Sequence, residues 1–399
     1  MAFRFPPNLD EADPPLLLAD DPAIVSAAQA AMMGLGRLAP QRVASGREAL
    51  HHLLGGDRPR RLVCQPSAAG SSWPALLATA RDPLSSAGIV VVLEDGPPIA
   101  GINAVLPRAA DLAAALSLPE PVAMASTAMP FPLTDPAELA SGLARGEFMV
   151  RYQPILRVAD RRPVLLEGLA RWHRHTTTPV GPELFIPLAE SSGQARALTE
   201  AVACAAFREM ATAPARLGAS ISLNLPLALL LERDVLPWLR GMMAGQRFPA
   251  SALILELTET TPVRDRPALR RALRRLEAAG VPVLIDDMGL EDDRAALMEL
   301  PFAGIKLDRH LVGALPGSRR ARAEVERLIR HAHRRRMTVT AEGVSDSRLW
   351  RAAAMAGADH VQGYAVSRPL SAAALAGWAS AWRGKRPHGS AVPRRSHSG

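Results

Sequence analysis

The sequence predicts two α/β units in tandem, of which the second is a TIM-like (βα)8 barrel. Short apolar strand candidates alternate with amphipathic helical segments along most of the 399 residues. Eight of these strand candidates fall within residues 136–383, which matches the strand number and the length of a (βα)8 barrel. A stretch rich in Pro, Ser, Ala and Thr at 118–135 separates them from a shorter alternation at 14–117, so we interpret it as a linker.

The first unit has the alternation that is typical of a doubly wound α/β domain. Its strand candidates are Leu16–Leu18, a segment near Val43, Leu62–Cys64, Gly88–Leu93 and Val105–Leu106. Its helical candidates are Ile24–Leu35, Gly46–Leu54, Trp73–Arg81 and Asp111–Leu116.

The second unit begins with a helix at Pro136–Arg145. Its strand candidates are Phe148–Ile155, Val164–Leu169, Ser220–Leu225, Leu253–Leu257, Val281–Ile285, Gly304–Leu307, Thr338–Ala341 and His360–Tyr364. Helical segments fill most gaps, among them Ala195–Met210, Pro267–Ala279 and Arg322–Arg335. The first connection, Val158–Pro163, is too short for a helix, so we expect the first two strands to form a hairpin. Residues 384–399 are basic and rich in Pro and Ser, which indicates a disordered tail.

Composition narrows the class of partner. The net charge of +8 favours phosphate-bearing ligands, but the signal is weak because a set of solvated helix faces explains the arginine clusters more simply. Aromatic residues make up only 4% of the chain, which argues against modules that stack nucleic-acid bases. Cys64 and Cys204 lack the paired spacing of a zinc site, and two cysteines far apart in sequence do not indicate a disulfide framework. With no leader pattern and no apolar run long enough for a bilayer, we expect a cytoplasmic protein without a membrane span.

Polar residues gather at the ends of the predicted barrel strands, where barrel enzymes build their sites. In chain order these are Glu167, Asn224, Glu256, Glu259, Asp286, Asp287, Lys306, Asp308, Glu342 and Gln362. Several carboxylates at one mouth would repel each other, and a divalent cation removes that repulsion. Carboxylate and amide oxygens suit Mg²⁺ or Mn²⁺, and two such ions can clamp a phosphodiester and activate a water.

Each of these residues could also have a purely structural role. A lone glutamate at a strand end is more often a cap or a surface acid than a metal ligand. The adjacent pair Asp286–Asp287 after an apolar strand is a stronger signal. The complete set at successive strand ends is difficult to explain as an accident.

These residues lie in strings that resemble the EAL family of cyclic-di-GMP phosphodiesterases, over about Leu143 to Trp382. The strings are Tyr152-Gln153-Pro154-Ile155, Glu167-Gly168-Leu169-Ala170-Arg171-Trp172, Phe185-Ile186-Pro187-Leu188-Ala189-Glu190, Ser222-Leu223-Asn224-Leu225, Glu256-Leu257-Thr258-Glu259, Asp286-Asp287-Met288-Gly289, Ile305-Lys306-Leu307-Asp308, Ala341-Glu342-Gly343-Val344 and Gln362-Gly363-Tyr364. Any one string is weak, whereas their order and spacing together are specific.

The resemblance implies an EAL-type barrel that hydrolyses cyclic-di-GMP to linear pGpG. The implied ligands of two Mg²⁺ or Mn²⁺ ions are Glu167, Asn224, Glu256, Asp286, Asp287 and Glu342, with Asp286 bridging the ions. Lys306 would orient the attacking water, Asp308 would support that end of the site, and Glu259 would brace the loop after the fifth strand. Arg171 would contact a substrate phosphate. Gln153 and Gln362 would line the substrate groove.

The chain departs from the family pattern at three places. Gly168 replaces the alanine of the signature triplet, and Pro226 replaces a serine. After Asp287 the run Met288–Arg294 replaces a glycine- and serine-rich loop and adds three acidic residues. An active phosphodiesterase is therefore one hypothesis, and a catalytically weak cyclic-di-GMP receptor or interaction module is another. A different metal-dependent hydrolase acting on a small phosphoester is a third.

The first unit resembles a response-regulator receiver domain, through Asp20-Asp21-Pro22 and Gly46-Arg47-Glu48-Ala49-Leu50. Gln65 stands where the resemblance implies the phospho-accepting aspartate, and glutamine cannot form an acyl phosphate. A silent receiver is therefore expected, and the acidic pair is more simply a helix cap. The resemblances imply a homodimer and a signalling partner at the first unit, and no nucleic-acid partner.

Overall fold

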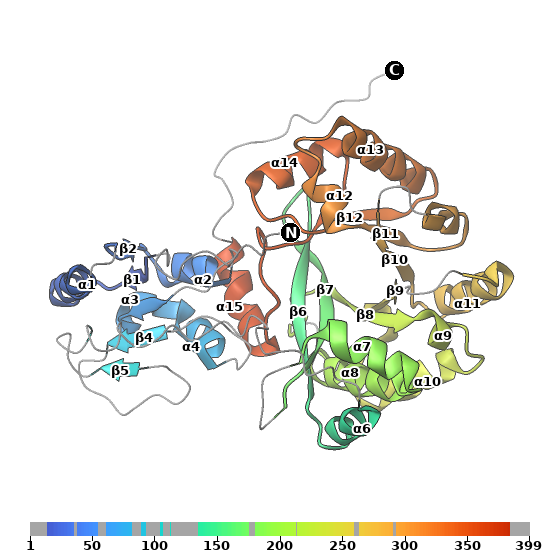
Figure 1. Ribbon diagram of the computed structural model, residues 1–399, viewed down its shortest axis with the longest axis horizontal. Helices are drawn as coiled ribbons and strands as arrows, with labels where there is room; N and C mark the ends of the chain where they lie inside the picture. The colour runs from blue at the N-terminus through green and yellow to red at the C-terminus, as the bar shows by residue number, and fades with distance from the viewer. Residues whose placement is uncertain are drawn as a thin grey trace, which may run out of the picture.

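The computed structural model describes residues 14–35, 38–54, 61–81, 89–92, 104–106, 112, 135–174, 180–212, 214–258, 263–289 and 293–383. These residues form two α/β parts, which Figure 1 shows side by side. The predicted tail at 384–399, all but the last residue of the predicted linker and all but Leu112 of the helix predicted at 111–116 lie outside the described residues.

The first part contains one parallel five-stranded sheet in the order β2-β1-β3-β4-β5. Its strands are β1 (Leu16–Leu18), β2 (Gln41–Arg42), β3 (Leu62–Cys64), β4 (Ile89–Val92) and β5 (Ala104–Leu106). Its described helices are α1 (Pro22–Gly34), α2 (Gly46–Leu54), α3 (Pro66–Ala69), the 3-10 turn η1 (Gly70–Ser72) and α4 (Trp73–Arg81). This strand order is one of the doubly wound orders, so the predicted fold class of this part is confirmed.

The second part is a closed eight-stranded barrel in the order β10-β11-β12-β13-β6-β7-β8-β9. Its strands are β6 (Phe148–Arg157), β7 (Pro163–Trp172), β8 (Ser220–Pro226), β9 (Leu253–Thr258), β10 (Val283–Met288), β11 (Gly304–Leu307), β12 (Thr338–Ala341) and β13 (His360–Val361). Strand β6 is antiparallel to both neighbours, and the remaining pairings are parallel. The predicted hairpin of the first two strands is confirmed.

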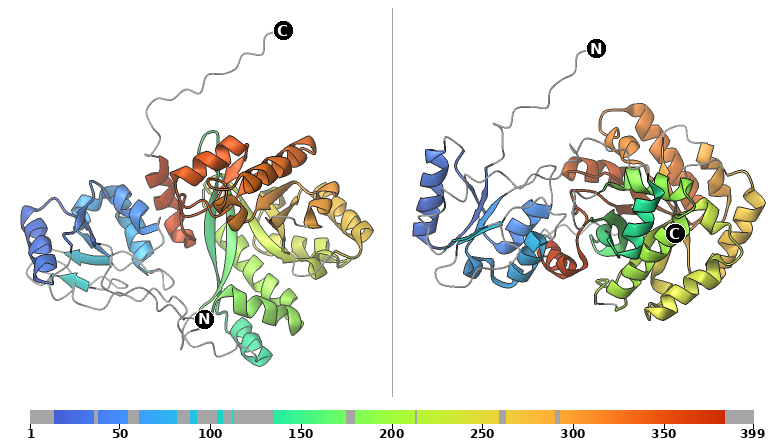
Figure 2. Two further views of the ribbon diagram at one scale, coloured as in Figure 1. Left: turned by 45° about the horizontal axis from the view of Figure 1, so that its top comes forward. Right: turned by 60° about the horizontal axis from the view of Figure 1, so that its bottom comes forward.

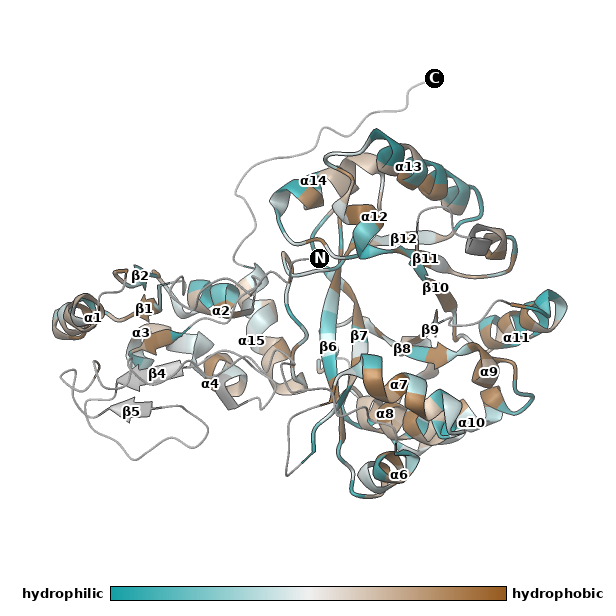
Figure 3. Ribbon diagram, viewed as in Figure 1, coloured by the Kyte–Doolittle hydropathy of each residue, from teal (hydrophilic) through white to brown (hydrophobic). Residues whose placement is uncertain are grey.

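Helices surround the barrel and cover its strands. They are α6 (Pro136–Ala144), α7 (Pro182–Ser191), α8 (Ala195–Glu209), α9 (Leu227–Leu230), α10 (Val235–Gly245), η3 (Ala250–Ala252), α11 (Arg266–Ala278), η4 (Asp293–Glu299), α12 (Arg309–Gly313), α13 (Arg319–Arg334), α14 (Ser347–Ala356) and α15 (Ala372–Arg383). Their apolar residues recur at helical spacing. In α13, Val325, Leu328, Ile329 and Ala332 are buried and the arginines are exposed. Figure 3 shows hydrophilic and hydrophobic segments alternating along this helix.

Six of the eight predicted barrel strands end at different residues in the structure, among them β13 and β10. Strand β13 covers only His360–Val361 because the chain turns at Gly363, whose φ is 148°. Strand β10 extends to Met288, and its pairing with β11 shifts register between Ile285 and Met288. A β-bulge of this kind re-aims the side chains that follow it.

Helix α15 connects the two parts. It contacts α2 and α4 of the first part and β6 of the barrel. In the two views of Figure 2 this helix lies between the two parts. Buried residues of α2, α4 and α15 therefore belong to the same apolar cluster as the barrel interior. Among the described helices, none combines the length and the apolar character that crossing a membrane requires.

Candidate metal and substrate site

Lys306 is the centre of a cluster of charged side chains at the carboxyl ends of the barrel strands. Its Nζ lies 2.6 Å from Glu342 Oε1, 2.8 Å from Glu256 Oε2, 3.0 Å from Asp286 Oδ1 and 3.2 Å from Glu167 Oε2. The lysine side chain is 1% exposed, and the four carboxylates around it come from β7, β9, β10 and the residue after β12. The structure therefore brings together five residues that the sequence predicted separately.

Burial sets the electrostatics of this cluster. It raises the pKa of Glu342 to about 8, because a carboxylate loses its hydration there. Burial together with the charge of Glu167 raises the pKa of Glu256 well above its ordinary value. Burial alone would lower the pKa of Lys306, but the surrounding carboxylates raise it well above the ordinary value. One ammonium thus faces four carboxylates, so the cluster retains an excess of negative charge when these groups are ionised.

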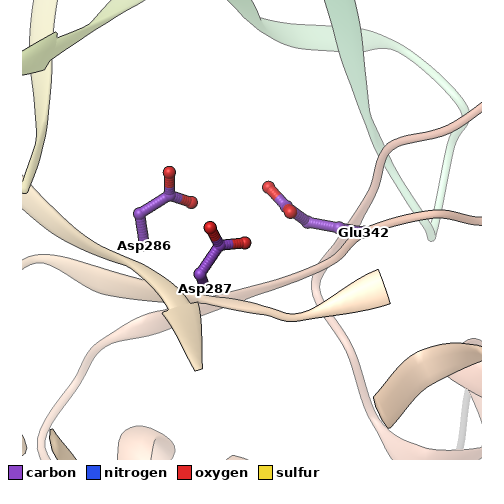
Figure 4. Close-up of side chains that lie close together, drawn as sticks. All are labelled: Asp286, Asp287 and Glu342. Atoms are coloured by element: carbon purple, nitrogen blue, oxygen red, sulfur yellow. The ribbon is translucent and has the colours of Figure 1, made fainter. Parts of the chain in front are cut away.

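The bulge in β10 brings two neighbouring aspartates to the same site. Successive side chains of a regular strand point to opposite faces, so adjacent acids would normally separate. Asp287 instead adopts a φ of 53°, in the left-handed region that a non-glycine residue rarely occupies. Oxygens of Asp286, Asp287 and Glu342 consequently lie within 4.8 Å of one another. Figure 4 shows the three carboxylates turned toward a common space.

Among the described residues, buried side-chain oxygens without a hydrogen-bond partner gather in this region. They include Oε1 of Glu256 and Oδ1 of Asn224, which lie opposite each other on the paired strands β8 and β9. An unpaired buried acceptor is costly unless something positive binds it. Carboxylate and amide oxygens are the donor set that hard divalent cations prefer. The residues present therefore fit a divalent metal centre.

A row of amide side chains extends the site across β6, β7 and the end of β13. Gln362 donates through Nε2 to Oε1 of Gln153 at 3.1 Å and also to Oε2 of Glu167. Gln153 is directly opposite Glu167 in the β6–β7 pairing. The two glutamines thus lie beside a predicted metal ligand, as a groove next to the metal site would require.

Arg171 lies farther along β7 and is half-buried. Its Nη1 donates to the carbonyl of Ala170 at 2.8 Å. Burial, assisted by the charge of Arg151, lowers the pKa of Arg171. Arg151 is a buried cation that the sequence analysis missed, because an arginine within a strand of mixed polarity gives no distinct signal.

Asp308, Glu259 and Pro226 were also singled out from the sequence, and the structure treats each of them differently. Asp308 begins α12 as its N-cap, and its Oδ1 accepts from the backbone N–H groups of His310 at 2.8 Å and Leu311 at 3.3 Å. Its predicted catalytic role stays a prediction beside this capping role. Glu259 lies outside the described residues, as do 290–292 of the altered loop. Pro226 precedes α9 as its N-cap, where no side-chain hydrogen bond is made.

The predicted acceptor position of the first part has a structural role. Gln65 Oε1 accepts the backbone N–H groups of Asp20 at 3.0 Å and Asp21 at 3.1 Å. Asp21 in turn caps α1, since its Oδ1 accepts from the N–H of Ala23 at 2.8 Å. The hydrogen bond from Ala23 to Asp21 therefore supports the interpretation of the acidic pair as a helix cap.

Comparisons with known proteins agree with this geometry. The family model described as "EAL domain" matches residues 137–369. A cyclic di-GMP phosphodiesterase of Pseudomonas aeruginosa, NbdA, is 32% identical over 251 residues, which are 62% of this chain and 32% of that protein. An uncharacterized signaling protein of Caulobacter vibrioides is 32% identical over 248 residues, 61% of this chain and 30% of that protein. The chain thus spans about a third of the length of these relatives.

Solved structures show the same fold. The PaMucR phosphodiesterase in its c-di-GMP complex has 27% sequence identity and a TM-score of 0.56, and the match covers 60% of this chain and 98% of that chain. The family model covers more than half of the chain, and the barrel with its strand-end acids agrees with it. This chain belongs to the EAL domain family.

Proposed function

We propose that the barrel hydrolyses cyclic-di-GMP to linear pGpG with the help of two divalent cations, Mg²⁺ or Mn²⁺. The relatives named above as phosphodiesterases support the reaction class, and PaMucR was solved with c-di-GMP bound. The observation that carries the proposal for this chain is the pair of partnerless buried oxygens, Glu256 Oε1 and Asn224 Oδ1, beside the acidic cluster.

The reaction is the addition of water to one of the two phosphodiester bonds. A water oxygen bonds to phosphorus, the bond from phosphorus to the 3′ oxygen breaks, and a proton reaches that oxygen. The product is a linear dinucleotide with a 5′ phosphate and a free 3′ hydroxyl. Divalent cations would supply a bound water of lowered pKa and would neutralise charge on the phosphate.

Each residue of the site would have a role that follows from its position. Glu167, Asn224, Glu256, Asp286, Asp287 and Glu342 would hold the cations. Lys306, already within hydrogen-bond distance of these carboxylates, would orient the attacking water. Arg171 would bind a phosphate oxygen, and Gln153 with Gln362 would line the groove. Asp308 would support the same end of the site from the start of α12.

A catalytically weak cyclic-di-GMP receptor is the second candidate. The sequence after Asp287 favours it, because Glu291, Asp292 and Asp293 add negative charge to the segment that follows a predicted metal ligand, and negative charge repels an anionic substrate. In this alternative the groove would bind the dinucleotide without turnover and transmit the signal through protein contacts. Another small-phosphoester hydrolase is the remaining alternative.

The test is chromatography of purified protein with cyclic-di-GMP and Mn²⁺ or Mg²⁺. We expect pGpG from the wild type, and a loss of at least a hundredfold in Glu167→Gln. Glu326→Gln is the matched control, since Glu326 lies on α13 and pairs with Arg330 at 3.6 Å. Binding of cyclic-di-GMP without product would select the receptor. Hydrolysis of other phosphoesters in a substrate panel, without binding of cyclic-di-GMP, would select the third alternative.

We further propose that residues 14–117 form a receiver-like domain that is not phosphorylated. The parallel sheet order and the contacts of Gln65 support this. Its work would be dimerisation or docking of a signalling partner in the cytoplasm, with 136–383 as the catalytic domain. Incubation with acetyl phosphate should add no phosphoryl group by mass spectrometry.

A further inference from the structure

Helix α15 packs against two parts of the chain at once. It contacts α2 and α4 on one side and the barrel strand β6 on the other (Figures 1 and 2). Its buried residues, Ala374, Leu375, Trp378, Ala379 and Ala381, lie within one broad arc of the helix surface. This arc is wide enough to pack against the first part and the barrel at the same time.

The face toward the first part depends on Gly377. A Cβ at this position would overlap the Cβ of Ala75 in α4 and would lie 3.1 Å from the Cα of Ala75. Ala374 and Ala381, three residues before it and four after it, lie on the same side of the helix and are buried. The two helices can approach this closely because residue 377 has no side chain.

The face toward the barrel depends on two tryptophans. Trp378 is 4% exposed, and its Nε1 donates to the carbonyl of Val366 at 3.2 Å. Trp382 stacks on Trp378 with ring centroids 6.1 Å apart. The Nε1 of Trp382 donates to the carbonyl of Arg161 at 2.9 Å, in the turn between β6 and β7. One indole therefore holds the outer turn of the hairpin, and the other holds the chain that precedes α15.

That preceding chain, residues 363–370, is called the wall segment here because it borders the amide row. Leu370 and Tyr152 of β6 exchange backbone hydrogen bonds of 2.7 and 2.8 Å. The carbonyl of Ser367 accepts from Gln153 Nε2 at 3.0 Å. Ser367 is the neighbour of Val366, so the contact with Trp378 is one residue from the contact with Gln153.

The contacts continue to the acidic cluster. Gln153 Oε1 accepts from Gln362, and Gln362 also donates to Glu167. A continuous series of contacts thus runs from Trp378 to a carboxylate of the cluster: hydrogen bonds join Trp378 to Val366, Ser367 to Gln153, Gln153 to Gln362 and Gln362 to Glu167, and the peptide bond joins Val366 to Ser367. The neighbouring side of the same helix, around Gly377, contacts the first part.

We propose that Trp378 is a positioning residue for the substrate groove, and that docking of the first part on Gly377 fixes the position of this tryptophan. Trp378 acts through the wall segment and touches neither substrate nor the reacting atoms. Its effect on substrate rests on the proposed function, whereas its effect on the wall segment does not. Energetic coupling between distant sites can travel through packed side chains and hydrogen bonds of this kind.

The first experiment compares Trp378→Phe with Trp382→Phe by hydrogen exchange. Each variant keeps a large ring and removes one indole N–H, so the pair differs mainly in which carbonyl is released. We expect amide exchange in residues 363–370 to accelerate at least fivefold in Trp378→Phe and to stay within twofold of wild type in Trp382→Phe. Unchanged exchange in Trp378→Phe would overturn the proposal, whatever the protein does to cyclic-di-GMP.

The second experiment separates the two faces of α15 with Gly377→Leu. The added side chain must displace α4, so we expect faster exchange in α2 and α4 and also in the wall segment. Gly241→Leu is the control, because Gly241 in α10 has open space around its Cβ position. If α2 and α4 exchange faster while the wall segment stays unchanged, the first part does not act on the groove and that half of the proposal fails.

Steady-state kinetics then distinguish positioning from loss of stability. Loss of the hydrogen bond from Trp378 to Val366, which holds the wall segment that Gln153 contacts, should raise KM for cyclic-di-GMP about fivefold in Trp378→Phe. The kcat value should change less than twofold, and Trp382→Phe should match wild type. A fall in kcat at unchanged KM would contradict a role at the groove. Absence of turnover and binding in the wild type would refute the proposed function, while the exchange results would still decide the connection.

Discussion

The Cδ2 atom of Leu223 lies 2.6 Å from the point where a Cβ on Gly168 would stand. Leu223 in β8 thus fills the space beside the signature triplet, and a methyl group at position 168 would collide with it. We expect Gly168→Ala to lower the free energy of unfolding by about 1–3 kcal/mol through overpacking. Leu223→Val makes room, so the double variant should lose less than the sum of the two single variants. Urea unfolding of the four proteins measures this coupling, and additive losses would contradict it.

Removal of the central cation should make the fold dependent on metal. In Lys306→Met the carboxylates of Glu167, Glu256, Asp286 and Glu342 face each other without the ammonium. In EDTA at pH 8 we expect a loss of about 3–5 kcal/mol, as for a broken buried ion pair. Mn²⁺ should recover part of this loss, because a divalent ion takes over the neutralisation.

Arg330→Met is the control for that experiment, since Arg330 makes an exposed ion pair with Glu326 on α13. Such a pair is worth at most about 1 kcal/mol, and its loss should not respond to Mn²⁺. Denaturant unfolding with and without the ion gives both values. An equal loss for Lys306→Met in EDTA and in Mn²⁺ would argue against a metal centre at this cluster.

The turn after β13 should tolerate no side chain at residue 363. Gly363 has a φ of 148°, and a Cβ there would overlap the backbone of Val344. Gly363→Ala should therefore cost more than about 1 kcal/mol. Gly313→Ala in α12 has open space, so it should be neutral or stabilising by up to about 1 kcal/mol. Thermal unfolding compares the two, and a shift in the same direction would count against the geometry of this turn.

The first part should depend on the oxygen of Gln65. Gln65→Ala removes the acceptor of two backbone N–H groups and should cost about 1–3 kcal/mol. Gln65→Glu keeps an oxygen in that place and should retain most of the stability. Amide exchange at Asp20 and Asp21, measured by NMR, checks whether the contact is responsible. Slow exchange of both amides in Gln65→Ala would show that it is not.

Cys64 should make the first part sensitive to alkali. Burial raises the pKa of its thiol to about 12, whereas an unfolded cysteine has a pKa of about 8.5. The native state thus retains the proton that the unfolded state releases. Stability from this group is fully present below pH 8.5 and declines as the pH rises toward 12, by about 2 kcal/mol at pH 10.

Chemical denaturation between pH 8 and pH 10 tests this decline. In Cys64→Ala, the free energy of unfolding should decline less steeply with pH, because the thiol no longer contributes. This should hold even though the variant is less stable than the wild type at every pH. Cys204→Ala should keep it, since Cys204 is half-buried on α8 and its thiol is less shielded. Parallel slopes for the wild type and Cys64→Ala would assign the decline to other groups.

Much of the fold could be predicted because its signals are local. Strands such as Gly304–Leu307 and Thr338–Ala341 are short apolar runs between turns, and the five-residue connection after Arg157 requires a hairpin. The helix α3 was not predicted, because Pro66–Ala69 leads into a Gly-Ser-Ser run that is typical of a loop. The contact between α15 and the first part was not predictable either, since an apolar helix face does not specify its partner.

The site could be predicted in its side chains but not in its arrangement. Acids at successive strand ends are visible in the sequence, and the barrel topology brings them together. The position of Lys306 among four carboxylates depends on three-dimensional packing, which no strand pattern contains. Gln153 donates to the backbone carbonyl of Ser367. Because every residue has such a carbonyl, the sequence does not indicate which one Gln153 contacts. The bulge that brings Asp287 beside Asp286 and Glu342 depends on the register between β10 and β11, which no single strand pattern contains.

The packing of α15 on α2 and α4 has a consequence for synthesis. Helix α4 ends at Arg81 and α15 begins at Ala372, so nearly 300 residues of translation separate the two surfaces. At about 5–20 residues per second the nascent first part waits roughly fifteen seconds to a minute for its covering helix. During that interval its alanine-rich face around Ala75 is open to chaperones or to neighbouring nascent chains. A ribosome that stalls within the barrel would therefore release a first part whose apolar face has no cover.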